Sequence, residues 1–406
     1  MINEIKKEKL NITVSLINFH FAHNYGAVLQ CLALQTLLQK RGYDLHVIDY
    51  RPYYQQQYYT RYANPFRCMY WRYKLLWGEK KSKRIFQSVR WGACVICGYR
   101  QAGRRGQLEE AFDPFVRRNL CLTKRYNSLK ELQKHPPKSD VYICGSDQVW
   151  NPLVTSGVDP AYYLDFGSDN HYRIAYAVSP CQALDTKYHR LLLSRLLGRF
   201  DAISLREAEK KAELEEHSNK SISICLDPTL LLHADDYYSF EEKIEDCDQY
   251  VLVYAFKETT GGNRIIGIVH EMQQRMKLRV IDISFEKIAW DIPVTKRFGI
   301  TPGQFLTYFR NAAFVVTNSF HGTAFSIIYR RPFLSIPKDG TAQRMTELLN
   351  KLELGNCLAA NNILPIGTPM PDYDHIAKRL EILCAESQQF LSQALGDVEK
   401  GDHREN

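Results

Sequence analysis

The fold class is decided by the first strand-helix-strand pattern, residues 12–50, ITVSLINFHFAHNYGAVLQCLALQTLLQKRGYDLHVIDY. An apolar run of strand length at 12–18 precedes a segment at 27–40 whose apolar residues recur with helical spacing. Gly42, a typical residue at a helix C-terminus, follows that segment, and a second apolar run occupies 45–50. The pattern predicts one β-α-β unit with two parallel strands.

Strands and helices alternate along the rest of the chain. Further strands are predicted at 141–144, 174–178, 202–204 and 222–226, with helices at 109–119, 187–197 and 207–216. A second series after Asp227 has predicted strands at 250–256, 279–283, 313–317 and 333–336, with helices at 263–276, 302–311, 322–330 and 343–352. Such alternation is typical of an α/β fold with parallel sheets covered on both faces.

Two series of this kind predict two Rossmann-like domains, residues 1–226 and 227–375, which we expect to face each other across a cleft. The remaining segment, 376–406, contains a predicted helix at 376–395 and a polar tail at 396–406. We expect this tail to be disordered.

The composition describes a globular protein. The chain has 406 residues, of which 45% are hydrophobic and 12% aromatic, which excludes wholesale disorder. No uninterrupted apolar run approaches the roughly 20 residues of a membrane-spanning helix, and the polar N-terminus has no signal-peptide core. We therefore expect a soluble, cytoplasmic protein. Its 11 cysteines are odd in number and scattered, as expected for free thiols in a reducing compartment.

The sequence predicts neither a metal nor a cofactor. The CxxC pair Cys94 and Cys97 has no second pair and no neighbouring histidine, so ordinary packing explains it best. HExxH, phosphate-loop and G-x-S-x-G motifs are also absent from the sequence.

One segment, residues 61–106, carries the positive charge of the chain. The whole chain has a net charge of +8, yet this segment alone holds 12 basic side chains against the single acid Glu79, interleaved with aromatic residues. Two interpretations stay open: docking on an anionic membrane surface, or a solvated helical lid whose aromatic residues pack on the core. A nucleic-acid-binding role is disfavoured because no recognised nucleic-acid-binding motif accompanies the segment.

Two short motifs follow predicted strands, where α/β sheets bind their ligands. Asn24, Tyr25 and Gly26 stand between the first strand and the first helix, whose N-terminus offers backbone donors to an anion. Gly26 could instead merely permit a tight turn, and the absent GxGxxG pattern argues against a dinucleotide. The second motif is a predicted substrate-facing loop containing Gly145, Ser146 and Asp147, although Ser146 or Asp147 could equally cap a turn.

Three further residues are candidates for binding an anionic substrate or transferring a proton. Ser204 to Glu207 matches a helix capping box, which does not explain Arg206, because a cation in the first helical turn opposes the helix dipole. An anion above that helix would explain it. His321, expected in the first turn of the helix that follows a predicted strand, is either structural or able to exchange a proton near pH 7. Arg344, near the start of another predicted helix, is a second candidate anion ligand.

These motifs, taken in order, resemble the polysaccharide pyruvyl transferase family. The matching stretches are NYGAVLQ at 24–30, GSDQVWN at 145–151, SLRE at 204–207, DPTLL at 227–231 and NSFHGT at 318–323, followed by RRPF at 330–333 and by Arg344. The resemblance implies a GT-B-like arrangement and transfer of the enolpyruvyl unit of phosphoenolpyruvate to a saccharide. The product would be a pyruvate ketal in a cell-surface polysaccharide such as a capsule or exopolysaccharide.

The resemblance also implies roles for individual residues. His321 would be the general acid, and Arg206 and Arg344 would hold the carboxylate and phosphate of the donor. The matched motifs make substrate-binding candidates of seven further residues, Asn24, Tyr25, Gly26, Gly145, Ser146, Asp147 and Ser319.

The alternative function is that of a GT-B-type glycosyltransferase using a nucleotide sugar, since fold does not fix function. The acceptor saccharide could be polymeric or linked to a polyprenyl diphosphate. In the latter case segment 61–106 would hold a peripheral enzyme on the inner face of the cell membrane. The sequence indicates no oligomeric state.

Overall fold

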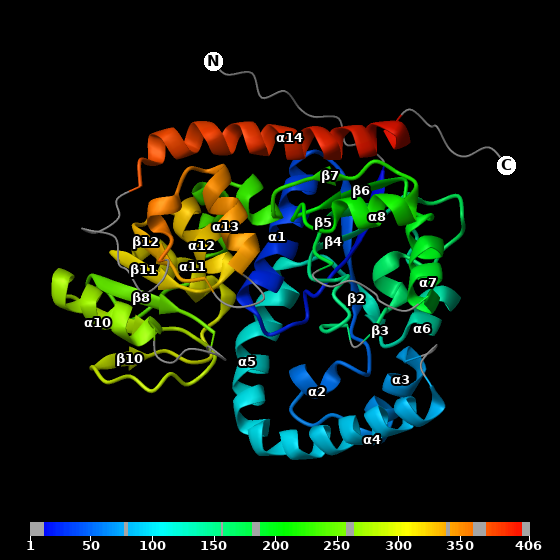
Figure 1. Cartoon of the computed structure of the whole chain (residues 1–406), viewed down its shortest axis with the longest axis horizontal. Coiled ribbons are helices and arrows are strands. Elements are labelled where there is room, and N and C mark those ends of the chain that lie inside the picture. Colours follow the sequence, from blue (N-terminus) through cyan, green and yellow to red (C-terminus); the bar gives the residue numbers. More distant parts are fainter. Residues whose placement is uncertain are drawn as a thin grey trace. The chain divides into compact units, whose positions relative to one another are not determined.

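The computed structural model of the protein describes residues 12–76, 80–155, 157–180, 187–256, 264–337, 342–359 and 371–399 (Figure 1). The chain divides into two compact units. The N-terminal unit comprises Met1–Leu231 with Glu386–Asn406, and the C-terminal unit comprises Leu232–Ala385. Each unit contains a parallel sheet with helices, so the predicted α/β class is confirmed.

In the described part of the N-terminal unit, seven parallel strands form a sheet in the order β3-β2-β1-β4-β5-β6-β7. Their bounds are β1 Thr13–Ile17, β2 Asp44–Tyr50, β3 Leu122–Tyr126, β4 Val141–Asp147, β5 Tyr172–Val178, β6 Ala202–Leu205 and β7 Ser223–Ile224. The α-helices of this unit are α1 Tyr25–Lys40, α2 Gln56–Tyr59, α3 Pro65–Leu75, α4 Lys81–Cys97, α5 Ala102–Asn119, α6 Leu129–Lys134, α7 Lys187–Leu197 and α8 Lys211–Ser218. Single 3-10 turns are η1 Gly98–Gln101, η2 Pro160–Tyr163 and η3 Pro228–Leu231.

The described part of the C-terminal unit has a smaller parallel sheet in the order β10-β9-β8-β11-β12. Its strands are β8 Tyr250–Tyr254, β9 Arg279–Asp282, β10 Val294–Lys296, β11 Phe314–Thr317 and β12 Phe333–Ser335. Its helices are α9 Ala234–Tyr237, α10 Arg264–Met276, α11 Pro302–Asn311, α12 Phe320–Ile328 and α13 Ala342–Lys351, with turns η4 Tyr238–Phe240 and η5 Gly355–Cys357. The last helix, α14 Tyr373–Glu399, has residues in both units.

Both sheets share the Rossmann order, in which the chain runs to one edge and then returns to the other side of its first strand. The point of reversal lies between β1 and β4 in one unit and between β8 and β11 in the other. Ligands of open α/β sheets bind outside the carboxyl ends of the strands at such points. The fold therefore marks one candidate position in each unit.

Helix α1 is buried on nearly all sides, which explains its apolar sequence. It packs against β2 and β4 on one side and against η3 on another. Asn24 begins the helix, because its side-chain oxygen accepts a hydrogen bond from the backbone N–H of Ala27 at 3.2 Å.

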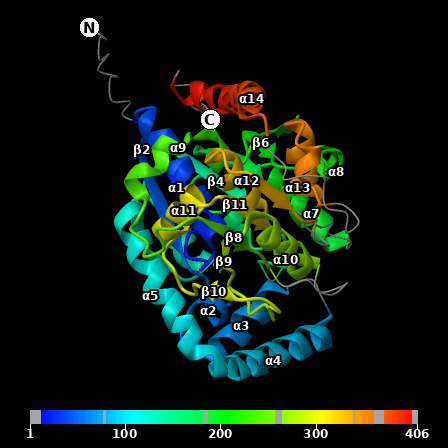
Figure 2. The same ribbon diagram turned by 90° about the vertical axis from the view of Figure 1, so that its left-hand side faces the viewer.

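The basic segment 61–106 folds into α3, α4, η1 and the start of α5, and Figure 2 shows α4 and α5 as two consecutive long helices. Helix α4 packs on α3. Ala63, Cys68 and Val95 form a small core there, with Trp91 and Tyr99 against it. Some aromatic residues of the segment therefore pack inward, as the lid interpretation expected, while Phe66 and Phe86 are exposed.

Several element bounds differ from the sequence expectations. Strands β3 and β10 were not expected because β3 is partly exposed and polar and β10 has only three residues. Helix α14 continues through Glu399, so residues 396–399 of the expected disordered tail are helical, and residues 400–406 lie outside the described residues. The units meet in sequence at Leu231 and Leu232 rather than at 226 and 227, and residues from Glu386 onward group with the N-terminal unit.

Arg173, at the start of β5, stabilises the loop that precedes this strand through hydrogen bonds to its carbonyl groups. Its side chain is fully buried and donates hydrogen bonds to the carbonyls of Leu164 at 3.1 Å, Phe166 at 3.0 Å, Ser168 at 2.7 Å and His171 at 2.9 Å. Burial lowers the pKa of Arg173 to about 10, so the guanidinium remains charged at neutral pH.

Replacing Arg173 should therefore destabilise the N-terminal unit. For Arg173→Leu we expect the free energy of unfolding to fall by about 3 kcal/mol or more, since four carbonyls lose their donor inside the protein. Chemical denaturation followed by circular dichroism measures this loss. The exposed Arg90→Leu in the same unit is the control, and coincident curves for both variants would contradict the assignment.

Candidate active site

One group of candidate residues lies at the reversal point of the N-terminal sheet, where α1 connects two of the predicted motifs. Asn24 caps α1, and one turn later Gln30 accepts a hydrogen bond from the backbone N–H of Ser146 at 3.0 Å. Tyr25 is fully buried and stacks on Phe112 with ring centroids 5.0 Å apart. Gly26 is buried within the first turn of α1 and does not form a tight turn of its own.

The second motif continues strand β4 instead of forming the expected loop. Gly145 has a φ of 120°, and a Cβ atom there would lie 2.2 Å from the carbonyl oxygen of Tyr176, so only glycine fits. Ser146 is fully buried and its hydroxyl donates to the carbonyl of Ala177 at 2.7 Å. Asp147, with a φ of 71°, ends the strand and is left partly exposed.

Arg206 follows β6 and is enclosed by three carboxylates from separate segments. Its Nη1 donates to Asp227 Oδ2 at 2.7 Å, its Nη2 to Asp147 Oδ1 at 3.2 Å and its Nε to Glu207 Oε1 at 3.2 Å. Its side chain is only 3% exposed. Burial alone would lower the pKa of Arg206, but the carboxylates of Glu207, Asp147 and Asp227 raise it above its ordinary value.

The predicted capping box at Ser204 to Glu207 is wrong. Ser204 lies in β6, where its hydroxyl accepts from the backbone N–H of Ala177 at 2.9 Å, and the next helix, α8, begins only at Lys211. Glu207 instead accepts a hydrogen bond from the hydroxyl of Ser179 at 2.7 Å. The sheet ladder extends past Leu205 because the Arg206 N–H donates to the carbonyl of Val178. Protein carboxylates, not a helix N-terminus, therefore surround Arg206, and its contact with a substrate anion stays a prediction.

A second charged cluster at the same sheet edge was missed in the sequence. His20, in the loop after β1, places Nε2 3.1 Å from Asp49 Oδ1 at the end of β2. Arg51 donates from Nε to the same carboxylate at 2.6 Å. Its Nη1 also lies 3.4 Å from Oδ2 of Asp113. The other oxygen of Asp113, Oδ1, is 3.9 Å from Nε2 of His23. The signal in the sequence was the run NFHFAHN at 18–24, two histidines directly after a predicted strand.

The two members of the pair His20 and Asp49 differ in charge. Complete burial lowers the pKa of His20 below its ordinary value, against the opposing effect of Asp49. For Asp49, burial would raise the pKa, but His20 and Arg51 lower it well below its ordinary range. We therefore describe His20 as neutral, donating from Nε2 to an ionised Asp49. Its Nδ1 is buried and has no hydrogen-bond partner within the described residues.

A separate group of candidate residues lies at the reversal point of the C-terminal sheet. Asn318 joins the ends of β8 and β11, accepting from the N–H of Phe256 and donating to its carbonyl, both at 2.7 Å. Ser319 caps α12 by accepting from the N–H of Gly322 at 3.3 Å. His321 therefore stands in the first turn of this helix, as predicted, and is 8% exposed.

Gly322 allows this helix to begin directly against the strand. A Cβ atom there would lie 2.1 Å from Thr317 Oγ1, whose hydroxyl donates to the carbonyl of Tyr254 at 2.6 Å. Arg344 lies in the first turn of α13 and is half-buried.

The predicted site residues thus fall into two groups. The N-terminal unit brings together Asn24, Gly145 to Asp147 and Arg206, whereas Ser319, His321 and Arg344 belong to the C-terminal unit. Within the described residues there is no group of three or more histidine, cysteine or acidic side chains arranged to hold a metal ion.

Comparison with known proteins identifies related sequences and folds. The family model for polysaccharide pyruvyl transferase matches residues 24–339. No match was found among curated proteins.

Solved structures with a similar fold include UDP-N-acetylglucosamine 2-epimerases. One is 12% identical with a TM-score of 0.50 over 98% of each chain. A putative one from Listeria monocytogenes is 10% identical with a TM-score of 0.48, covering 98% of this chain and 99% of the other. These likenesses concern the fold alone.

The neutral, buried state of His20 predicts a pH-dependent stability. The folded protein resists protonation of this ring while the unfolded chain does not, so stability is complete above pH 6.5 and falls as the pH decreases. We expect the wild type to lose up to about 1.4 kcal/mol per pH unit below that point through this residue. His20→Gln should flatten the dependence of the free energy of unfolding on pH, measured by denaturation between pH 5 and 8.

The exposed His46→Gln in the same unit serves as the control and should leave the wild-type dependence unchanged. Parallel curves for the wild type and His20→Gln would refute a neutral buried His20.

Proposed function

The chain belongs to the polysaccharide pyruvyl transferase family, and from this membership we propose that it transfers the enolpyruvyl unit of phosphoenolpyruvate to a saccharide, forming a pyruvate ketal. The observation that carries the proposal is the extent of the family match. Residues 24–339 include the motifs beside both sheet reversal points, Gly145 to Asp147 at one and Ser319 to His321 at the other.

The proposed chemistry needs a proton donor and cationic groups that bind the anionic phosphoenolpyruvate. The methylene carbon of phosphoenolpyruvate takes a proton, and a sugar hydroxyl attacks the neighbouring carbon and returns its own proton to the group that gave the first one. Phosphate then leaves, and a second hydroxyl of the same sugar closes the ketal and gives up its proton to that phosphate. Atoms and charge balance without an oxidant or a further reactant. In this scheme His321 gives the first proton, supported by its position in a helical first turn at the end of β11.

Donor binding is assigned to Arg206 and Arg344. Phosphoenolpyruvate has a carboxylate and a phosphate, and guanidinium groups bind both well. Arg206 is enclosed, so an anion would reach it by displacing or joining a carboxylate. Asp147 is the best placed for this, because its side chain is 17% exposed, against 10% for Glu207 and 0% for Asp227.

We further propose that the acceptor belongs to cell-surface polysaccharide assembly, is carried on a lipid, and is met by a cytoplasmic enzyme at the membrane surface. No helix in the described ranges is long and apolar enough to cross a bilayer. Support for peripheral attachment comes from α4, where Ile85, Phe86, Val89 and Ile96 are exposed. Their spacing places all four within one arc of the helix, beside the arc of the buried Arg84, Ser88, Gly92 and Val95.

Basic side chains accompany this apolar stripe. Lys83 and Arg90 lie beside it on α4, and the whole segment 61–106 has an excess of 11 positive charges. An apolar helix face flanked by lysine and arginine is typical of proteins that lie on anionic bilayers.

His321→Ala should abolish most of the transfer activity. General acid–base catalysis typically contributes about 10²- to 10⁴-fold, and we expect a fall in kcat within that range. The measurement is saccharide-dependent release of phosphate from phosphoenolpyruvate, with the ketal product identified by mass spectrometry. His270→Ala, on α10 of the same unit, is the control and should retain activity. A His321→Ala enzyme of near-normal rate would remove the histidine from the mechanism.

Thermal unfolding in the presence of ligands separates the proposal from the glycosyltransferase alternative. Phosphoenolpyruvate should raise the unfolding temperature of both wild type and His321→Ala, whereas nucleotide sugars should not. Stabilisation by nucleotide sugars alone would reject pyruvyl transfer.

Membrane attachment through α4 predicts loss of binding when its apolar stripe is made acidic. In sedimentation with phosphatidylcholine–phosphatidylglycerol vesicles, we expect Phe86→Asp/Val89→Asp to reduce the bound fraction about tenfold or more, since apolar contact and charge attraction are both weakened. Leu153→Asp, which alters an exposed apolar residue outside the segment, is the control. Equal sedimentation of the two variants would exclude α4 as the attachment surface.

A further inference from the structure

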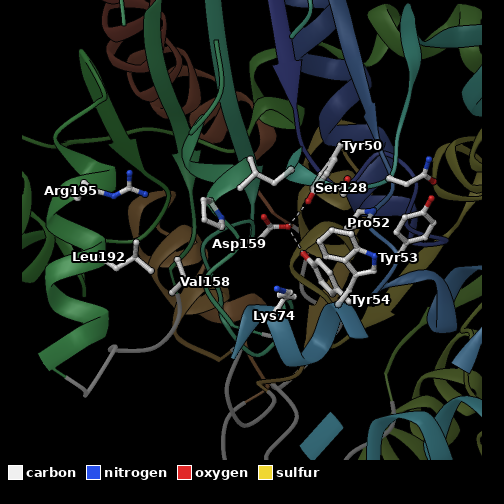
Figure 3. A pocket seen from close by; sticks show the side chains of 14 residues that line it. Tyr50, Pro52, Tyr53, Tyr54, Lys74, Ser128, Val158, Asp159, Leu192 and Arg195 are labelled. Carbon is white, nitrogen blue, oxygen red and sulfur yellow. Dashed lines mark hydrogen bonds between the residues drawn. The ribbon is translucent and has the colours of Figure 1, made fainter. Parts of the chain in front are cut away.

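A pocket of about 310 Å³ lies in the N-terminal unit, beyond the carboxyl ends of β2 and β3 (Figure 3), and none of the residues assigned to catalysis lines it. Tyr50 ends β2, Asn127 and Ser128 follow β3, and Val158 and Asp159 belong to the loop before η2. Helices α3 and α7 contribute Trp71 and Leu192 to its lining. The volume is at the lower end of the range of small-molecule sites.

The walls of the pocket are apolar and aromatic. Trp71 and Tyr53 lie nearly parallel, with ring centroids 6.1 Å apart and an interplanar angle of 24°. Pro52, Leu129 and Leu192 complete these walls. A ligand that fills the pocket would therefore exchange water for hydrocarbon and ring surface.

The carboxylate in the pocket is already satisfied by the protein. Asp159 Oδ2 accepts the hydroxyls of Tyr50 at 2.9 Å and Tyr54 at 2.7 Å, the two contacts drawn in Figure 3, and Oδ1 accepts the N–H of Ala161 at 3.0 Å. Complete burial raises the pKa of Asp159 above its ordinary value. The acid thus offers little to sugar hydroxyls or to a cation, which makes a polar saccharide a poor match for this pocket.

Two cationic side chains line the pocket, and they differ in whether a carboxylate already pairs with them. Arg195 of α7 donates to Asp165 at 3.1 Å. Lys74 of α3 is exposed, lies 5.6 Å from the ring centroid of Tyr70, and forms no ion pair with any residue that the structure describes. Lys74 is therefore the charge best able to bind an anionic group at the pocket.

Helix α3 connects the pocket to the exposed surface of the basic segment. Trp71 and Lys74 line the pocket, while Phe66 and Tyr70 on the same helix are exposed. Residues four apart are neighbours on a helix, so Lys74 adjoins Tyr70 and Tyr70 adjoins Phe66. Apolar surface thus leads from solvent to the cation and then into the pocket.

We propose that this pocket binds a lipid phosphate, with the first part of the apolar chain between Trp71, Tyr53 and Leu192 and the phosphate at Lys74. The proposal stands on the pocket alone. The further reading, that this lipid carries the acceptor saccharide, rests on the proposed function.

Binding is tested on the full chain with farnesyl monophosphate as a short water-soluble probe, titrated by isothermal calorimetry without vesicles. We expect saturable binding, at least tenfold weaker binding of farnesol, which lacks the phosphate, and no binding of inorganic phosphate, which lacks the chain. Absence of farnesyl phosphate binding overturns the proposal, and equal affinity for farnesol overturns the role of Lys74.

Two pairs of variants locate the probe. Leu192→Trp fills the pocket from α7 and should weaken binding at least tenfold, whereas Leu191→Trp changes the neighbouring exposed residue and should not. Lys74→Glu should weaken binding about tenfold, whereas Lys81→Glu makes the same charge change on α4 without effect. Lys74 is exposed, so its variant tests the proposal even where Leu192→Trp fails to fold. Unchanged affinity in Lys74→Glu and in a folded Leu192→Trp would overturn it.

Two further arms separate the sources of the ligand and the two proposals. Dihexanoyl phosphatidic acid replaces the isoprenoid by acyl chains: comparable binding supports a general lipid phosphate, and a preference of tenfold or more for farnesyl phosphate supports an isoprenoid carrier. If the protein binds farnesyl phosphate but does not transfer the pyruvyl group, the lipid-phosphate pocket is supported and the proposed function is rejected.

Discussion

A single buried guanidinium organises the carboxyl edge of the larger sheet. Arg206 holds Asp147 at the end of β4, Glu207 beyond β6 and Asp227 at the start of η3, three segments that are distant in sequence. Taking a charge out of water is costly unless partners surround it, and removing one partner leaves the others uncompensated. Two of these partners stand at structurally exact positions, since Asp147 has a φ of 71° and Asp227 directly precedes η3, which packs against α1.

The sequence predicted the parts of the structure that arise from periodicity. Helices α7 and α11 have the predicted bounds, and most central strands differ by one to three residues. Edge strands β3 and β10 escaped prediction because a strand covered on one side needs no apolar run. The capping box predicted at Ser204 was wrong because the same residues can also form a strand. In β6 the hydroxyl of Ser204 accepts a hydrogen bond from the neighbouring strand β5. The local sequence pattern cannot distinguish a helix cap from a strand where a tertiary contact determines the conformation.

The same limit explains the candidate site. His321 was predicted correctly in the first turn of a helix, because an apolar strand followed by a helical pattern is a local signal, whereas the capping role of Ser319 was not predicted. The two histidines after β1 were a signal in the sequence, but their partners Asp49 and Asp113 could not be predicted, because they come from a strand and a helix that only the folded protein brings to that loop. The lipid-phosphate pocket has the same origin, since the residues that line it extend from Tyr50 to Arg195.

The concentration of charge in segment 61–106 makes the protein a strong electric dipole. With a net charge of +8 and an excess of 11 in this segment, the rest of the chain has −3. Such a molecule turns in the field of an anionic surface before it touches it, so encounter and orientation occur together. At physiological ionic strength the Debye length is about 8 Å, so the surface orients the protein only at short separations. In concentrated salt this electrostatic orientation is lost. The same asymmetry would make the protein bind a cation exchanger through one region only, at a pH where its bulk is repelled.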